Sequence, residues 1–263
     1  MSQAAQLIAA AVRPRLQHRG KPLLIGLCGS QGSGKSTLCR ELASHWSGEQ
    51  LLTAVLSLDD LYLTRAEREC LRREVHPLLA TRGPPGTHDV KLGIATLKAL
   101  GSHARVRLPR FDKANDERCP QADWHVVAAP VDVILFEGWC VGARPQSRAM
   151  LVDPVNALES TEDVNGRWRT YVNERLADEY QTLFALIDVQ VLLAAPGFDV
   201  VLKWRTQQER ELRAQTEGPA VMDDVALARF IQHYERLTRH ILCEMPSRVD
   251  LLIPLDEERR VRC

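Results

Sequence analysis

An eleven-residue stretch from Leu27 to Thr37, LCGSQGSGKST, combines glycines, a lysine and hydroxyl side chains in a spacing suited to binding phosphate. It follows an apolar run, precedes a helical pattern and matches G-x-x-x-x-G-K-[ST]. Backbone N–H groups of such a loop can surround phosphate oxygens, and the N-terminus of the following helix adds partial positive charge. The stretch therefore predicts a nucleoside triphosphate site formed by Gly29, Ser30, Gln31, Gly32, Ser33, Gly34, Lys35, Ser36 and Thr37.

A second pattern, VILFEGW, predicts a metal ligand beside this loop. Its apolar strand ends in Glu137, which puts a carboxylate at the carboxyl edge of the sheet. Because an unpaired buried carboxylate is costly, a cation is its natural partner. We expect Lys35 to reach the β- and γ-phosphates, and Ser36 and Glu137 to hold Mg²⁺. A capping or ion-paired glutamate is the alternative.

The stretch SLDDLYLT indicates what happens to the phosphate. Asp59 and Asp60 stand where another strand leaves the sheet. An acceptor hydroxyl must lose its proton as the phosphoryl group arrives, and an aspartate can take that proton. Since adjacent side chains of an extended segment point opposite ways, only one of the pair should face the terminal phosphate. We assign Asp59 as the general base and expect Asp60 to bind backbone or a Mg²⁺-bound water, with an Asp-Asp turn cap as the alternative.

The elements that must position these groups alternate between strand and helix. Nearly continuous apolar runs predict strands buried on both faces, at residues 22–28, 53–58, 131–137, 188–194 and 249–255. Helical patterns lie between them, including one with Leu38, Leu42 and Trp46 and a last long one with Phe230, Ile231, Tyr234, Leu237 and Ile241. This alternation predicts an α/β fold with a doubly wound parallel sheet and helices on both faces, and ligands at the carboxyl ends of the strands.

Residues 1–263 are predicted to form one domain, with an amphipathic N-terminal helix over residues 1–20 that buries Leu7, Ile8 and Val12. Two stretches, about 65–123 and 142–165, fit the alternation poorly and are expected to be irregular. The basic run RAERECLRREV within the first of them, with Arg65, Arg68, Arg72 and Arg73, is expected to be an exposed helical face.

Composition narrows the function classes. The 34 Lys and Arg residues balance 34 Asp and Glu residues, which argues against a nucleic-acid-binding surface. No apolar stretch reaches the length needed to span a bilayer. The seven cysteines are scattered, odd in number and without C-x-x-C spacing, as expected for reduced thiols in a cytoplasmic protein.

Taken together, the phosphate loop, SLDDLYLT, HPLLATRGPPGTHD, LPRFDKANDER, DVILFEGWCVGARPQ and WRTQQE resemble the P-loop D-glycerate 3-kinase family, from about Lys21 to Arg260. That family is related to uridine kinase, pantothenate kinase and phosphoribulokinase. The resemblance implies a sheet of the P-loop kinase type and ATP- and Mg²⁺-dependent phosphorylation of D-glycerate to 3-phosphoglycerate. It also implies that the base is Asp59 and that Glu137 helps to hold Mg²⁺.

If the acceptor is glycerate-like, residues 65–125 are expected to form its binding insertion. Arginine reads a carboxylate with two parallel hydrogen bonds, so Arg82 and Arg110 are the candidate clamps. His88, Asp89 and Asp112 are candidates for binding the hydroxyls, and Lys113 for assisting with charge. The alternative is a solvated polar loop whose Asp and Arg side chains pair with each other.

A helical lid is expected at residues 200–220, where DVVLKWRTQQERELRAQTEG is rich in Arg and Gln. A mobile helix there could bring a guanidinium group to the developing charge and exclude water. Arg205 is the first candidate for this catalytic role, followed by Arg210 and Arg213, and a plain surface helix is the alternative.

Three other functions remain open at this stage. A nucleotide-driven switch or ATPase is disfavoured because neither N-K-x-D nor L-S-G-G-Q occurs. A kinase acting on pantothenate, a nucleoside or another sugar acid would need the same catalytic groups, since pocket shape decides the acceptor. A degenerate member that binds ATP without turnover is disfavoured because Lys35, Ser36, Asp59 and Glu137 are all present.

Overall fold

A computed structural model describes residues 1–16, 20–102, 104–215 and 224–262, and of residues 208–215 only the backbone. The described α-helices are α1 (Gln3–Leu16), α2 (Lys35–Gly48), α3 (Arg65–Glu74), α4 (Val90–Ala99), α5 (Ala157–Glu162), α6 (Arg167–Ala177), α7 (Glu179–Phe184), α8 (Phe198–Gln215) and α9 (Asp224–Glu244). The described strands are β1 (Leu23–Gly29), β2 (Thr53–Ser57), β3 (Arg105–Leu108), β4 (Phe111–Asp112), β5 (Glu117–Arg118), β6 (His125–Ala128), β7 (Val133–Gly138), β8 (Val189–Ala194) and β9 (Leu251–Pro254). Short 3₁₀ turns are η1 (Leu58–Leu61), η2 (Pro77–Ala80), η3 (Gln121–Asp123), η4 (Arg148–Leu151) and η5 (Met245–Ser247).

The five strands predicted from the apolar runs form one parallel sheet in the order β2-β7-β1-β8-β9. The first strand in sequence, β1, lies at the centre, between β7 and β8. Every residue of β1 and β7 is buried, as expected for central strands covered on both faces. The α/β prediction with a doubly wound parallel sheet is therefore confirmed.

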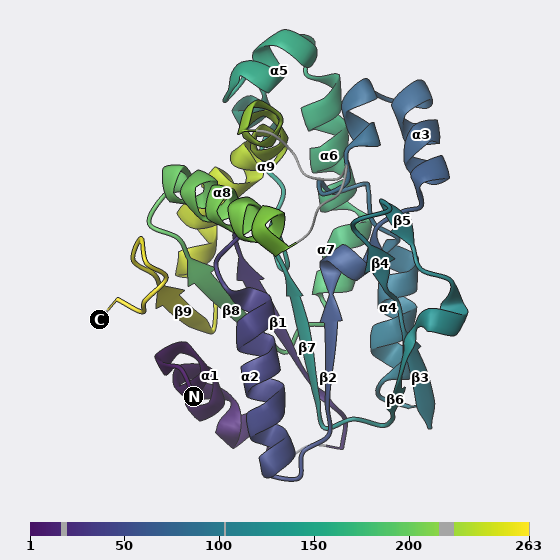
Figure 1. The fold of residues 1–263 in the computed structure, drawn as a ribbon, viewed down its shortest axis with the longest axis vertical. Helices are drawn as coiled ribbons and strands as arrows, with labels where there is room; N and C mark the ends of the chain where they lie inside the picture. The colour runs from purple at the N-terminus through teal and green to yellow at the C-terminus, as the bar shows by residue number, and fades with distance from the viewer. Residues whose placement is uncertain (17–19, 103, 216–223, 263) are drawn as a thin grey trace.

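Alternate side chains of the central strands enter two different apolar cores. Leu23, Ile25 and Leu27 of β1 pack with α1, α2 and α8 on one face, whereas Leu24 and Cys28 pack with α4 and α7 on the other. Figure 1 shows α1 and α2 in front of the sheet and α4 behind it, while α9 contributes side chains to both cores. Because side chains alternate in this way, each face of the sheet is covered by its own apolar core.

The N-terminal helix differs from the prediction at one position. The buried side of α1 consists of Ala5, Ile8 and Val12, spaced three and four residues apart. Leu7 is 40% exposed, because it is offset by about 100° around the helix from Ile8 and so leaves the buried stripe. No helix among the described residues is long and apolar enough to cross a membrane.

The stretch expected to be irregular around residues 65–123 is more ordered than predicted. It contains α3, α4 and two small antiparallel pairs, β3–β6 and β4–β5. Arg68 of α3 is 2% exposed, so the prediction that it belongs to an exposed basic face is wrong. Its guanidinium donates hydrogen bonds to the carbonyls of Leu63, Ala80 and Asp116, and it forms an ion pair of 2.8 Å with the Asp116 carboxylate, which balances its buried charge.

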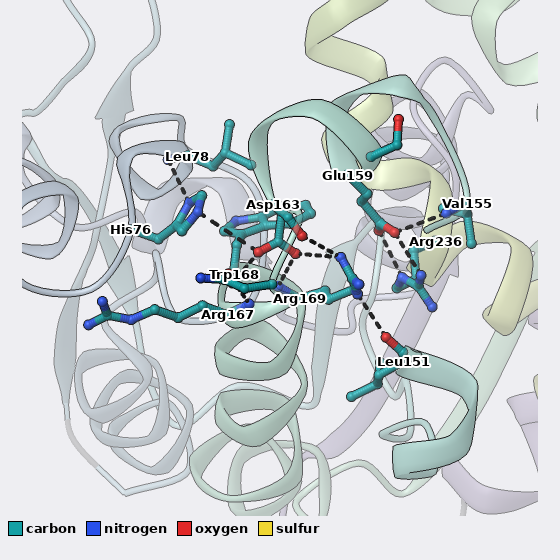
Figure 2. Close-up of polar contacts among 12 residues, drawn as sticks. His76, Leu78, Leu151, Val155, Glu159, Asp163, Arg167, Trp168, Arg169 and Arg236 are labelled. Atoms are coloured by element: carbon teal, nitrogen blue, oxygen red, sulfur yellow. Dashed lines mark hydrogen bonds and ion pairs between the residues drawn. The ribbon is translucent and has the colours of Figure 1, made fainter. Parts of the chain in front are cut away.

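A network of buried charges fixes the helices above the sheet (Figure 2). Arg236 of α9 makes two hydrogen bonds with the carboxylate of Glu159, which is fully buried on α5. Beside it, the fully buried Asp163 accepts hydrogen bonds from Arg169 and from the backbone of Trp168 on α6. These pairs hold the stretch at residues 148–163 against α6 and α9, and α9 in turn carries two aromatic residues of the site described next.

Candidate active site

The phosphate loop joins β1 to α2 in the position that its sequence pattern predicts. Gly32 has φ +76, and a Cβ there would lie 2.7 Å from Cβ of Trp204 on α8, so only glycine fits both the backbone angle and the space. Gly34, with φ +89, precedes the first turn of α2. The loop is thus fixed by its backbone conformation and by α8 packed directly against it.

Two polar contacts connect the start of α2 to its surroundings. Lys35 Nζ donates a hydrogen bond of 2.9 Å to the carbonyl of Ser30. Ser36 Oγ donates one of 2.8 Å to Oε1 of Glu137, which is 5% exposed near the end of β7. The hydroxyl and the carboxylate predicted to share Mg²⁺ therefore lie in direct contact.

The loop also holds polar atoms whose partners are not among the described protein groups. Ser30 Oγ, Ser33 Oγ and Gln31 Oε1 are buried there without a hydrogen-bond partner. Buried polar groups in folded proteins are nearly always satisfied, so these atoms indicate a site built for a polar ligand or ordered water. Together with the helix N-terminus, they fit a bound polyphosphate.

Asp59 lies in η1, directly after β2, and both of its carboxylate oxygens are engaged. The hydroxyl of Tyr62 donates to Oδ1 at 2.8 Å, and Lys113 Nζ donates to Oδ2 at 2.6 Å. Burial raises the pKa of Asp59, but the charge and hydrogen bond of Lys113, with help from Tyr62 and Lys35, hold that pKa well below its usual range. Asp59 is therefore in the carboxylate form that a proton acceptor requires, and the contact with Lys113 makes it a weaker base.

Lys35, Ser36, Glu137 and Asp59 line one cleft of about 380 Å³, a volume typical of small-molecule sites. Its described walls are Gln31, Gly32, Gly34, Lys35, Ser36, Thr37, Ser57, Asp59, Tyr62, Arg82, Lys113, Glu137, Gly138, Trp139, Arg205, Phe230 and Tyr234. The phosphate-loop lysine and the candidate base thus open into the same space. This is the arrangement needed to bring a phosphate and an acceptor together.

The RGPPGTHD loop, which borders the cleft, is buried rather than solvated. Gly83 has φ +130, and a Cβ there would lie 2.1 Å from the hydroxyl oxygen of Tyr234. The same hydroxyl donates to the carbonyl of Arg82 at 3.0 Å, and Trp139 Nε1 donates to the carbonyl of Gly83 at 3.0 Å. The backbone of this segment is therefore not solvated, but the Asp–Arg pairing of that alternative does occur, between Arg82 and Asp116 and between Arg118 and Asp89.

Arg82 reaches the cleft but is already paired. Its Nη1 contacts the carboxylate of Asp116, its Nη2 donates to the carbonyl of Lys113 at 3.4 Å, and its guanidinium lies over the ring of Phe111. Arg82 thus holds the turn between β4 and β5 in place. Its role as a carboxylate clamp remains a prediction.

The structure places His88 and Asp89 behind the cleft wall. His88 is 3% exposed, stacks on Tyr62 and shares a 2.6 Å hydrogen bond with the hydroxyl of Tyr180. Asp89 caps α4 through the backbone N–H of Leu92. Neither side chain is among the described residues that line the cleft. His88 is held by its two aromatic partners, and Asp89 is held by the Leu92 backbone and by an ion pair of 3.3 Å with Arg118.

Asp60, Arg110 and Asp112 are likewise not among the described cleft-lining residues. Asp60 accepts a hydrogen bond from the backbone of Phe111, as its predicted backbone role requires, and burial raises its pKa to about 6. Arg110 is exposed. Asp112 accepts hydrogen bonds from the backbone of residues 114 and 115 and so shapes the β4–β5 turn.

Arg205 of α8 lines the cleft, as expected of a lid residue. The side chains of Arg210 and Arg213, the other lid candidates, lie outside the described residues. The first part of α8 is held by the C-terminal turn, where Arg259 Nε donates to the carbonyl of Gly32 at 2.6 Å. The guanidinium of Arg259 also lies over the ring of Trp204, so one side chain connects the phosphate loop with α8.

Sequence reasoning missed the aromatic part of the site. Tyr62, Trp139, Phe230 and Tyr234 all line the cleft. The helical pattern of residues 230–241 predicts Phe230 and Tyr234 as part of an apolar stripe, and that pattern does not reveal that one edge of the stripe faces a cavity. Tyr62 had a usable signal, because it lies three residues after Asp59, at a spacing from which its hydroxyl can reach back to the carboxylate.

The chain matches the Phosphoribulokinase / Uridine kinase family over residues 24–170. An uncharacterized kinase of Schizosaccharomyces pombe is 35% identical over 230 residues, which cover 82% of this chain and 79% of that protein. The chloroplastic D-glycerate 3-kinase of Arabidopsis thaliana is 33% identical over 257 residues, which cover 90% of this chain. They cover 53% of that protein, so the chain spans about half the length of this relative.

The solved structure of D-glycerate 3-kinase from Cryptococcus neoformans var. grubii is similar to this chain along its whole length. The TM-score is 0.78 at 26% sequence identity, and the match covers 100% of this chain and 99% of the other. The arrangement of sheet and helices is thus shared with a P-loop kinase.

Proposed function

The chain belongs to the phosphoribulokinase/uridine kinase family and is an ATP-dependent P-loop kinase, and from this premise we propose that its acceptor is D-glycerate and its product 3-phosphoglycerate. The two relatives named D-glycerate 3-kinase support this choice of acceptor. The observation that carries the chemistry is that Asp59 and Lys35 line the same cleft. An aspartate there can serve an alcohol acceptor, whereas a nucleotide switch has no need of it.

In the proposed reaction, the acceptor hydroxyl oxygen attacks the γ-phosphorus of ATP. The bond to the bridging oxygen between the β- and γ-phosphates breaks, ADP leaves, and Asp59 takes the hydroxyl proton. Lys35 stabilises charge on the phosphates, and Arg205 of α8, which lines the same cleft, does so as well. Closure of α8 would exclude water, which competes with the acceptor for the phosphoryl group.

The cleft also fits Mg²⁺. Ser36 Oγ and Glu137 Oε1 would hold the ion, which when bound neutralises charge on the phosphates. Among the described residues, no three His, Cys, Asp or Glu side chains cluster as a metal site. Most ligands would therefore be phosphate oxygens and water, the usual arrangement for Mg²⁺ in kinases.

The acceptor would lie between the phosphate loop and the β4–β5 turn, within reach of Lys113. Ordered walls favour this position, because the RGPPGTHD backbone is held by Tyr234 and Trp139 and needs no ordering when the acceptor binds. We assign acceptor binding to the insertion at residues 65–125 and closure to the lid expected at residues 200–220, of which residues 216–220 lie outside the described residues.

The test is ADP release measured with D-glycerate, L-glycerate, pantothenate and uridine as acceptors. We expect ADP to form in step with D-glycerate consumption and the other three compounds to react far more slowly. ADP formation at the same rate with and without acceptor would instead indicate an ATPase. Preference for pantothenate or uridine would keep the kinase and replace the acceptor.

A further inference from the structure

We propose that Lys113 selects an anionic acceptor by exchanging its ion pair with Asp59 for one with the acceptor's carboxylate. The inference rests on the proposed function, because it takes Asp59 as the base. It goes further by making one residue responsible for discriminating hydroxy acids from neutral alcohols. It also means that Asp59 is freed from Lys113 only when a hydroxy acid binds.

The contact between the two residues is direct. Lys113 Nζ lies 2.6 Å from Asp59 Oδ2, and both side chains line the cleft. Tyr62 occupies the other carboxylate oxygen. An acceptor hydroxyl that is to give its proton to Asp59 must therefore approach a carboxylate that is already paired.

Lys113 can move while the chain around it stays in place. Its side chain is 57% exposed, although the β4–β5 turn that carries it is tied down by two arginines. Arg82 contacts the carboxylate of Asp116 and the carbonyl of Lys113, and Arg68 donates to the carbonyl of Asp116. Only the flexible lysine stem must rotate for the ammonium to leave Asp59.

The two arginines predicted to clamp a carboxylate are placed differently from Lys113. Arg82 is engaged with Asp116 and Phe111, and Arg110 is exposed and not among the described cleft-lining residues. Lys35 and Arg205, the other described cations of the cleft, stand on the phosphate-loop helix and on α8, where the triphosphate would engage them. Lys113 is the cation that stands beside the base.

An exchange of one carboxylate for another at Lys113 favours a negatively charged acceptor. A hydroxy acid offers Lys113 a second carboxylate in place of Asp59, so the ammonium keeps a charged partner while the base becomes accessible. A neutral alcohol offers no such partner, so it would leave the Lys113 ammonium and the Asp59 carboxylate, whose side chain is 30% exposed, without their charged partners. The acceptor class is therefore a small alcohol that bears a carboxylate.

The experiment compares D-glycerate with D-glyceramide, in which a neutral amide replaces the carboxylate. In the wild type we expect a strong preference for the acid in kcat/KM. In Lys113→Met we expect the acid-to-amide ratio to fall roughly 10- to 100-fold, the range for losing one hydrogen bond to a charged group. ATP hydrolysis without acceptor should rise, because Asp59 is no longer covered.

Two further variants keep the test decisive. Lys113→Arg retains the positive charge and should keep most of the acid preference. Lys98→Met removes an exposed lysine of α4 by the same substitution and should leave the ratio unchanged. A wild-type acid-to-amide ratio in Lys113→Met would overturn the inference, and unchanged binding of MgADP would show that this variant is folded.

Failure of this inference can be told apart from failure of the proposed function. If Asp59→Asn is inactive and D-glycerate is the preferred substrate, but Lys113→Met keeps the preference, only the exchange is wrong. If another hydroxy acid is the substrate, its acid-to-amide ratio is measured in the same way. If uridine is preferred, both the acceptor assignment and the exchange are wrong.

Discussion

Ser36 at the start of α2 donates a 2.8 Å hydrogen bond to Glu137 near the end of β7, although 101 positions separate the two residues in the chain. Glu137→Gln keeps an oxygen that can accept this bond but removes the charge that would hold Mg²⁺. We expect the Mg²⁺ concentration for half-maximal activity to rise roughly 10- to 100-fold. A Mg²⁺ titration curve identical to that of the wild type would exclude Glu137 from metal binding, and Glu162→Gln, on the exposed side of α5, is the control.

Asp59→Asn should retain ATP binding and lower turnover by roughly 10²- to 10⁴-fold, the usual range for loss of a general base. Asparagine can still accept the hydrogen bond from Tyr62, so the fold of η1 should survive. The measurements are kcat from a coupled ADP assay and the dissociation constant of a non-hydrolysable ATP analogue. Near-normal turnover would remove Asp59 from the mechanism.

Arg259→Met should loosen the phosphate loop, because it removes the 2.6 Å hydrogen bond to the Gly32 carbonyl and the contact with Trp204. We expect KM for ATP to rise roughly 10-fold, the effect of one charge-assisted hydrogen bond, with a smaller change in kcat. Arg260→Met removes a neighbouring exposed arginine of the same turn and serves as the control. Equal effects of the two substitutions would contradict a specific role for Arg259.

Arg236→Met should destabilise the protein by roughly 3–5 kcal/mol, because it leaves the carboxylate of Glu159 buried and unpaired. Arg229→Met provides a matched control, since Arg229 pairs with Glu162 between the same two helices but at the surface. Exposed pairs contribute about 0–1 kcal/mol. Urea unfolding of both variants checks the difference, and equal losses would show that the buried pair has no special importance.

Stability should fall as pH drops below about 6.5, partly because of His88. Burial lowers the pKa of His88 to about 3, whereas the unfolded residue titrates near its ordinary value of about 6.5. The unfolded chain then binds the proton first, so the stability from the neutral histidine is complete above about 6.5 and is lost as pH falls toward 3. From pH 7.5 to pH 5 we expect a loss on the order of 2 kcal/mol from this residue.

His88→Gln should reduce that loss, and His125→Gln, at an exposed position, should leave it unchanged. The measurement is urea unfolding at pH 7.5 and pH 5. Burial also lowers the pKa of His233, to about 4, so some dependence on pH should remain in the His88 variant. If His88→Gln left the loss of stability between pH 7.5 and pH 5 unchanged, that loss could not be assigned to His88.

Local patterns were sufficient for the framework of the molecule. Continuous apolar runs predicted all five strands of the main sheet, and the spacing of Leu38, Leu42 and Trp46 predicted the buried face of α2. The resemblance to P-loop kinases is confirmed by the family match. The same kind of pattern misplaced Leu7, because an apolar residue next to a stripe cannot be distinguished by type from one within it.

The polar partners could not be predicted in this way. Nothing near Arg68 in the chain indicates that it is buried beneath the turn that contains Asp116, and nothing near Arg82 indicates that it is paired with that same residue. Each pairing depends on where the insertion packs against the sheet. The residue types therefore indicated which chemistry the region could perform, whereas the role of each arginine could not be predicted from the sequence.

By itself the sequence determined the parallel α/β framework and the phosphate loop. It also determined that one acid follows β2 and another lies near the end of the neighbouring strand β7. These features depend only on periodicity and spacing over a few residues. The tertiary structure decided which side chains share the cleft. It placed Lys113 against Asp59, brought Tyr234 to the RGPPGTHD loop and kept His88 behind the wall. The physical reason is that such contacts join residues far apart in the chain, and only the packing of whole elements brings them within hydrogen-bonding distance.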